Sequence, residues 1–249
     1  AGAAPALCVD ALFGTGLARP LAPEIAGLLR GVAAAGCPLV AVDILSGICA
    51  DSGRSLGGGS LPQAAFRNYL VQDYLFLIQF SRAWALAVVK AGDLQEMRAC
   101  SATVHALLDQ EMALHVQTCA AAGIDTAAML ATPEAVGNMA YTRYVLEAGY
   151  SGDFLDLLAA LMPCVLGYGE IGARLGREGA PDTPYRDWID TYAGDDYQQT
   201  CRAAGALLDD AVRKRLGDAP QSSPRWAALV HHFATATRLE VGFWDLGTA

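Results

Sequence analysis

The chain has 249 residues, 53% of them apolar, which is enough to bury a large core in one domain or two. Its 17 Lys and Arg against 26 Asp and Glu give a net charge of −9, which argues against nucleic-acid binding because that function needs clustered positive charge. Seven irregularly spaced cysteines, with no CxxC pair and no zinc-type His/Cys spacing, indicate reduced thiols in a cytoplasmic protein without a metal site. Neither a membrane-spanning apolar run nor a signal peptide is evident in the sequence.

The first sixty residues have the pattern of a small α/β unit. Apolar runs at 6–13 and 38–44 predict two strands, and the spacing of 22–35 predicts a helix between them. Such a strand–helix–strand unit is parallel and right-handed, and both strands end near an Asp, at the edge where these sheets bind ligands. Gly14-Thr15-Gly16 is a weak sign of a phosphate loop, because any tight turn at this place favours glycine.

This unit carries the motifs Asp10-Ala11-Leu12-Phe13-Gly14-Thr15-Gly16-Leu17, Ala41-Val42-Asp43-Ile44-Leu45-Ser46-Gly47 and Ala50-Asp51-Ser52-Gly53. In these motifs it resembles the YjeF N-terminal family, the NAD(P)HX epimerases. The resemblance implies that Asp10 and Ser46 hold potassium and that Gly14 and Asp43 contact the nucleotide. Leu45 stands where the family has a proline, and the family's upstream strands and Asn/Gly-rich loop have no counterpart. We therefore expect only a partial, Rossmann-like βαβ fragment over residues 1–58.

After the glycine-rich junction at 57–59 the pattern becomes helical. Helical spacing predicts helices over 64–91, 94–123, 133–149, 152–176, 195–216 and 223–246, with a short aromatic segment at 185–192. Asp93 and Glu96 have the spacing of a capping box, and Thr132-Pro133 is predicted to begin the third helix. The fold class is therefore mainly α, with an all-α domain over residues 59–249.

Two features of these helices indicate a site. Pro163 is predicted to kink the fourth helix, where Cys164 and, one turn later, Tyr168 share a face. A cysteine on an apolar helix face is more often structural, so this spacing alone decides nothing. Asp73 lies in the apolar run 69–76, where an unpaired carboxylate would be costly to bury, and this favours a functional interpretation.

Further motifs recur along the whole helical region. They are Gly59-Ser60-Leu61-Pro62, Tyr69-Leu70-Val71-Gln72-Asp73-Tyr74, Phe80-Ser81-Arg82-Ala83, Glu111-Met112-Ala113-Leu114-His115, Ala140-Tyr141-Thr142-Arg143-Tyr144, Leu161-Met162-Pro163-Cys164, Tyr168-Gly169-Glu170-Ile171-Gly172, Trp188-Ile189-Asp190-Thr191-Tyr192 and Leu239-Glu240-Val241-Gly242-Phe243-Trp244. In this order they resemble the TenA family of thiaminase II or aminopyrimidine aminohydrolases, over residues 59–247. The resemblance implies a haem-oxygenase-like helical bundle that acts in thiamine salvage, needs no cofactor and forms homotetramers.

The resemblance also implies a role for each site residue. Cys164 would attack the electron-poor pyrimidine ring, which requires a thiolate and therefore either a lowered thiol pKa or a base near the sulfur. Glu240 would move protons, with its pKa raised by an aromatic pocket. Asp73 would hold the amino group and ring nitrogen of an aminopyrimidine or of thiamine. The ring would lie among the aromatic residues Phe76, Tyr141, Tyr168 and Tyr192.

Several alternatives stay open from the residues alone. Glu240 could instead form an ion pair with Arg238 or Arg225, and Glu111 with His115 reads better as a helix pair than as a metal site. The first TenA helix, with its Trp and His-Pro-Phe, has no counterpart before Gly59, so we expect an exposed apolar stripe that favours self-association. Two alternative functions are epimerase activity of the N-terminal fragment and a bundle that binds a pyrimidine or a partner without turning it over.

Overall fold

The computed structural model describes residues 8–10, 39–41 and 56–244. In the N-terminal part it shows two short strands, β1 (Cys8–Asp10) and β2 (Leu39–Ala41). They pair in parallel, with Val9 opposite Val40. The helix expected over 22–35 lies outside the described residues, as do the candidate site residues Gly14, Asp43 and Ser46. Of Asp10 only the backbone is described.

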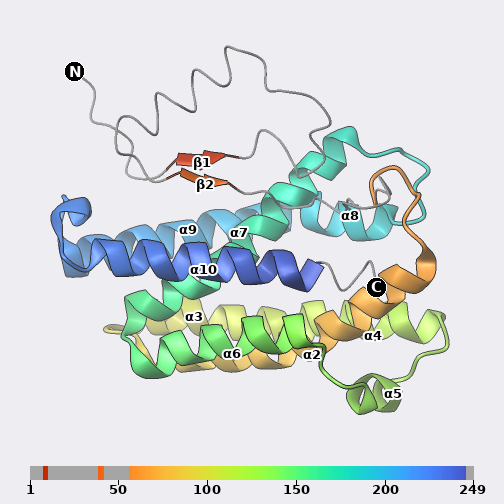
Figure 1. The fold of residues 1–249 in the computed structure, drawn as a ribbon, viewed down its shortest axis with the longest axis horizontal. Helices are drawn as coiled ribbons and strands as arrows, with labels where there is room; N and C mark the ends of the chain where they lie inside the picture. The colour runs from red at the N-terminus through yellow and green to blue at the C-terminus, as the bar shows by residue number, and fades with distance from the viewer. Residues whose placement is uncertain (1–7, 11–38, 42–55, 245–249) are drawn as a thin grey trace.

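Residues 56–244 form a bundle of helices (Figure 1). The elements are α2 (Gln63–Lys90), α3 (Leu94–Ala106), the π-helix η1 (Leu107–Glu111), α4 (Met112–Ala121), α5 (Thr126–Ala131), α6 (Val136–Ser151), α7 (Phe154–Glu178), α8 (Arg186–Ala193), α9 (Asp195–Leu216), the 3-10 turn η2 (Pro220–Ser222) and α10 (Trp226–Trp244). In Figure 1, α2, α3 and α6 run side by side along one side of the bundle, and α7 crosses toward α8 and α9 on the other. The helical bundle expected from the sequence is therefore present.

Helix α7 is the centre of this bundle, in contact with α2, α6, α8, α9 and α10. It begins with a complete capping box, in which Asp153 and Asp156 each bond the other's backbone amide. It continues as one helix through Pro163. Although no membrane-spanning run was expected, α7 could cross a membrane by length and composition, but 89% of its most apolar window is buried. The helix therefore has the burial of a core helix.

The structure differs from the predicted helices in two places. The helix expected over 94–123 contains the π-turn η1, and the third long helix begins at Val136 instead of at Pro133. The reason for the later start lies on α2, where buried Gln72 donates to the carbonyl oxygen of Pro133 and accepts from the amide of Ala135, at 3.0 and 2.9 Å. These bonds hold the segment before α6 in an extended form. Helix α5 was not predicted.

An ion-pair cluster joins α3 to the end of α9. The Asp93 side chain accepts the Glu96 amide at 2.9 Å, as expected for a capping box. The Glu96 side chain, however, accepts the amide of Gly92, at 2.7 Å, instead of that of Asp93. Buried Glu96 also binds Arg215 through both oxygens, at 2.7 and 2.8 Å, and Lys214 pairs with Asp93. The basic residues at the end of α9 therefore form ion pairs with specific carboxylates, besides interacting favourably with the negative end of the helix dipole.

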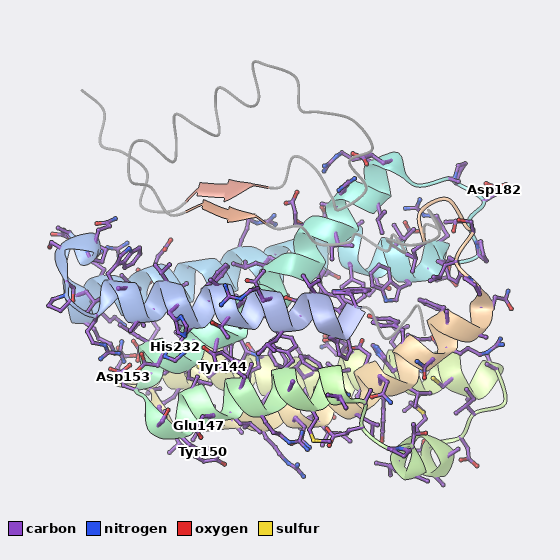
Figure 2. The ribbon with its side chains drawn as sticks, viewed as in Figure 1. Tyr144, Glu147, Tyr150, Asp153, Asp182 and His232 are labelled. Atoms are coloured by element: carbon purple, nitrogen blue, oxygen red, sulfur yellow. The ribbon has the colours of Figure 1, made fainter. Side chains whose placement is uncertain are left out.

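A second cluster fastens α10 to α6 and α7. Arg225 binds Asp153 and Asp156 at distances of 2.8–3.1 Å. Figure 2 shows Tyr144 and His232 close to one another near this end of the bundle, where the Tyr144 hydroxyl lies 3.0 Å from Nδ1 of His232. Since Arg225 is engaged here, it does not pair with Glu240, and Arg238 binds Thr235 instead. Both ion-pair alternatives for Glu240 are thus wrong.

Candidate active site

A cavity of about 480 Å³ lies between α2, the α3–η1–α4 rod, α7, α8 and the start of α9. Its volume is in the range of small-molecule binding sites. Five of the seven residues predicted for the bundle line it, namely Asp73, Phe76, Cys164, Tyr168 and Tyr192. They come from α2, α7 and α8, so helices far apart in the sequence bring them together.

Asp73, which is 2% exposed, is paired with a buried histidine. Its Oδ2 lies 2.7 Å from Nε2 of the buried His115 on α4 and accepts a hydrogen bond of 3.1 Å from the Tyr69 hydroxyl. The Tyr69 hydroxyl lies 3.0 Å from that of Tyr168. The premise of an unpaired buried carboxylate was therefore wrong. Oδ1 of Asp73 receives no hydrogen bond from residues 56–244, and it is the oxygen left for a ligand.

His115 is the positive partner of this pair. Its Nδ1 lies 2.9 Å from the backbone carbonyl of Glu111, so the expected helix pair exists, but through the main chain. Burial lowers the pKa of His115, but the charge and hydrogen bond of Asp73 outweigh that effect and raise it to about 9. The Glu111 side chain, whose pKa is raised by burial, accepts the Tyr192 hydroxyl at 2.9 Å.

Cys164 is 8% exposed and reaches the cavity from α7. Burial first, and then the carboxylates of Glu240, Glu111 and Asp73, raise the pKa of the Cys164 thiol well above its usual range. The free site therefore holds a neutral thiol, and nucleophilic attack requires a base to take its proton. The hydroxyl of Tyr168, one turn later on the same helix, is hydrogen-bonded to that of Tyr69.

Glu240 on α10 and Tyr141 on α6 are not among the residues that line the cavity, and both are 1% exposed. Neither side chain makes a hydrogen bond of standard geometry within the described residues. They lie close enough to interact electrostatically with one another and with Cys164. Burial and the charge of Asp73 raise the pKa of Glu240 to about 8, against the opposing effect of Tyr141. The upward direction is the one expected from the sequence, and it gives a carboxyl that exchanges protons near neutral pH.

Aromatic rings surround these polar groups. Phe76 packs on Tyr141 with ring centroids 5.3 Å apart, and Tyr168 packs on Tyr192 at 5.0 Å. Tyr69 stacks on Trp244 at 5.0 Å. A flat heteroaromatic ring matches such walls, because offset and edge-to-face contacts with it are favourable.

The remaining lining residues make the cavity acidic. Its ionisable side chains, apart from the thiol and tyrosines, are all carboxylates and include no Lys, Arg or His: Asp73, Glu111, Asp190, Asp195 and Asp196. Asp190 is paired with Arg186, and the Asp73 charge is balanced by His115 behind it. The remaining excess of negative charge favours a cationic ligand over a phosphorylated one.

Comparison with known proteins places these residues in a family. Residues 54–248 match the TENA/THI-4/PQQC family, and residues 2–66 match the YjeF-related protein N-terminus. An aminopyrimidine aminohydrolase of Halalkalibacterium halodurans is 38% identical over 195 residues, which are 78% of this chain and 84% of that protein. An uncharacterized protein of Haemophilus influenzae is 37% identical over 196 residues, covering 78% and 88% of the two chains.

A solved structure extends the likeness to the coordinates. A TenA family transcription regulator from a Silicibacter species is 61% identical in sequence and superposes with a TM-score of 0.75, covering 77% of this chain and 85% of that one. The aminohydrolase name belongs to one relative and the regulator name to the other. The matched region contains the whole described bundle and all seven residues predicted for its site. The chain therefore belongs to the TENA/THI-4/PQQC family.

Proposed function

We propose that the helical bundle is an aminopyrimidine aminohydrolase of the thiaminase II type. It would convert 4-amino-5-aminomethyl-2-methylpyrimidine to hydroxymethylpyrimidine and ammonia, and would cleave thiamine more slowly. The observation that carries this proposal is the arrangement of Cys164 and Asp73, which line one cavity, with the buried Glu240 close enough to interact electrostatically with the thiol. The names of curated relatives at 25–38% identity support the same reaction class.

The cavity suits the proposed substrates in charge and shape. Asp73 Oδ1 is available to an amino group and ring nitrogen, and a carboxylate is the natural partner of such an amidine-like edge. The aromatic walls match a flat pyrimidine ring. The acidic residues near the start of α9 would attract the aminomethyl group or the thiazolium cation.

Each proton has a place in the proposed reaction. Ionised Glu240 takes the proton of the Cys164 thiol while sulfur bonds to the pyrimidine ring carbon, and the ring nitrogens accept the electron pair. The Glu240 carboxyl returns this proton to the exocyclic amine, which leaves as ammonia as the electron pair forms a double bond to the methylene carbon. Water then adds to the methylene and gives its proton to Glu240. Breakage of the carbon–sulfur bond restores the aromatic ring, and the thiolate recovers its proton.

The test is release of ammonia from the aminopyrimidine by the purified full chain. Cys164→Ser is expected to lower kcat at least about 10³-fold while hydroxymethylpyrimidine still binds, since the nucleophile is lost and the cavity is kept. Cys201→Ser is the matched control, because Cys201 lies outside the cavity lining and its hydrogen bond to the Val165 carbonyl can pass to the serine hydroxyl. A Cys164→Ser variant with most of its rate would exclude covalent catalysis. Binding without ammonia release in the unmodified protein would leave a non-catalytic bundle.

A second candidate function rests on the match of residues 2–66 to the YjeF-related N-terminus. This segment would epimerise hydrated nicotinamide nucleotides with the help of potassium. The test is chromatographic separation of the two epimers after incubation with the full chain, with and without potassium. An unchanged epimer ratio under both conditions excludes this activity. We also propose that the chain is a cytoplasmic protein and forms a homo-oligomer. Light scattering of the purified protein would test the oligomeric state.

A further inference from the structure

The partners of the two ring nitrogens of His115 indicate its protonation state. Nδ1 of His115 faces a backbone carbonyl oxygen at 2.9 Å, and since a carbonyl can only accept, this nitrogen carries a proton. At Nε2 the partner is Oδ2 of Asp73, at 2.7 Å. That same oxygen also accepts the Tyr69 hydroxyl proton at 3.1 Å. Burial lowers the pKa of His115, but the charge and hydrogen bond of Asp73 raise it to about 9, so the proton between Nε2 and Oδ2 lies on the nitrogen and His115 is an imidazolium.

Among the titratable groups that face Asp73 in the described bundle, His115 is the one that can carry a positive charge. The other titratable groups that face Asp73 come from five elements, and they are Tyr69 on α2, Glu111 on η1, Cys164 and Tyr168 on α7, Tyr192 on α8 and Glu240 on α10. All of them are neutral or negative. Without His115, the Asp73 carboxylate would be buried without a positive partner, among groups that disfavour its charge.

We propose that His115 is a positioning residue that keeps Asp73 ionised, so that the cavity binds an aminopyrimidine in its ring-protonated, cationic form. This inference rests on the proposed function. An ionised Asp73 offers only acceptors, and therefore a ring nitrogen that faces it must carry a proton. The neutral ligand then takes one proton from solvent as it binds. A protonated ring is also more electron-poor and more open to attack by sulfur. His115 thus acts on the reaction without touching the substrate.

The first experiment examines the free protein. Long-range 1H–15N spectra of the full chain distinguish a doubly protonated imidazole from either neutral tautomer, and the His115→Gln variant identifies the signal among the four histidines. We expect both nitrogens of His115 to be protonated at pH 7, in line with a pKa raised to about 9 by Asp73 after the opposing effect of burial. A neutral His115 at pH 7 would overturn the inference. This result does not depend on any enzymatic activity.

The second experiment counts protons. Titration calorimetry with hydroxymethylpyrimidine, in buffers of different ionisation enthalpy and at a pH above the free ligand's ring pKa, should show uptake of about one proton per ligand. His115→Gln keeps an N–H donor for Asp73 but removes the charge, and we expect uptake to fall toward zero. Equal uptake in both proteins, or none in the unmodified protein, contradicts the proposal. If the pyrimidine does not bind at all, the proposed function fails, and the charge of His115 is still judged from the spectra.

The kinetic signature separates this role from a merely structural one. In His115→Gln we expect kcat to fall by roughly 10²-fold with KM changed much less, and the acidic limb of the pH profile to move to higher pH. His105→Gln is the matched control, since His105 also pairs with a carboxylate, Asp109 at 2.6 Å, but on the exposed surface of the same helical rod. A parallel loss of kcat in the control, or an unmoved pH profile in His115→Gln, would count against the proposed role.

Discussion

Gly172 on α7 lies directly against the backbone of Tyr192 on α8. A Cβ added to Gly172 would overlap with the main-chain carbon and oxygen atoms of Tyr192. Backbone atoms cannot rotate away as a flexible side chain can. The position of α8, and with it of the Tyr192 hydroxyl that bonds Glu111, therefore depends on the missing side chain at Gly172.

We expect Gly172→Ala to shift α8, to lower the free energy of unfolding by roughly 1–3 kcal/mol and to reduce turnover about 10-fold or more. Denaturant melts and ammonia release measure the two effects. Gly205→Ala is the control, because a Cβ on Gly205 of α9 meets no atom within 4 Å. That change should raise stability by about 0.5–1 kcal/mol through the higher helix propensity of alanine. Full activity in Gly172→Ala would show that the site tolerates a displaced α8.

Glu240 makes the stability of the fold depend on pH. Burial and Asp73 raise its pKa to about 8, well above that of an ordinary glutamate, so the native state favours the protonated form. A carboxyl with a raised native pKa destabilises the fold increasingly as pH rises from its unfolded pKa to its native one. Glu240→Gln should therefore be about as stable as the unmodified protein near pH 4.5. Its advantage should grow to the order of a few kcal/mol by pH 8, as thermal melts across this range would show. A stability difference that does not vary with pH would contradict a buried, titrating Glu240.

Tyr141 allows stability and function to be separated. Its buried hydroxyl makes no hydrogen bond within the described residues, so Tyr141→Phe should change the free energy of unfolding by less than about 0.5 kcal/mol or raise it. If the hydroxyl serves the substrate, kcat/KM should fall roughly 10-fold. Tyr69→Phe is the comparison, because this hydroxyl contacts both Asp73 and Tyr168, and its loss should cost about 1–2 kcal/mol. Unfolding curves and substrate titrations of both variants test this contrast. An unstable Tyr141→Phe would indicate a partner for the hydroxyl inside the fold.

The Glu96–Arg215 pair is expected to hold α3 to α9. Glu96 is 1% exposed, and Arg215→Met would remove the two hydrogen bonds that its carboxylate receives from Arg215. We expect a loss of roughly 2–3 kcal/mol in the free energy of unfolding, because the buried charge would keep only the longer contact with Lys214, at 3.7 Å. Arg213→Met removes an exposed ion pair with Asp210 on the same helix and should cost less than about 1 kcal/mol. Urea unfolding of both variants measures the difference, and equal losses would mean that burial of Glu96 does not matter.

Most of the fold could be predicted from the sequence because its helices are long and strongly periodic. The prediction for 195–216 agrees with α9 at both ends, and that for 64–91 agrees with α2 within one residue. The start of α6 could not be predicted, since it depends on Gln72 of another helix. The π-turn was also missed, because an extra residue in one turn changes a periodic pattern too little to be seen.

The site divides in the same way. The cavity-lining residues Asp73, Cys164 and Tyr192 could be named from motifs, but their partners Tyr69, His115 and Glu111 were missed as members of the site. His115 could have been suspected as a site residue, because it belongs to the same motif as Glu111. It could not be joined to Asp73 without coordinates, because the two positions are 42 residues apart in the chain.

The π-turn at Leu107–Glu111 sets the direction in which the rest of its rod faces. An α-helix turns by about 100° for each residue, so a rod with one residue fewer in this turn would point the His115 ring well away from Asp73. The extra residue of the π-turn thus sets the rotation of α4 relative to α3. With α3 held to α9 by the Glu96–Arg215 pair, this rotation directs His115 toward Asp73. A variant that lacks this extra residue would therefore need another positively charged side chain beside Asp73.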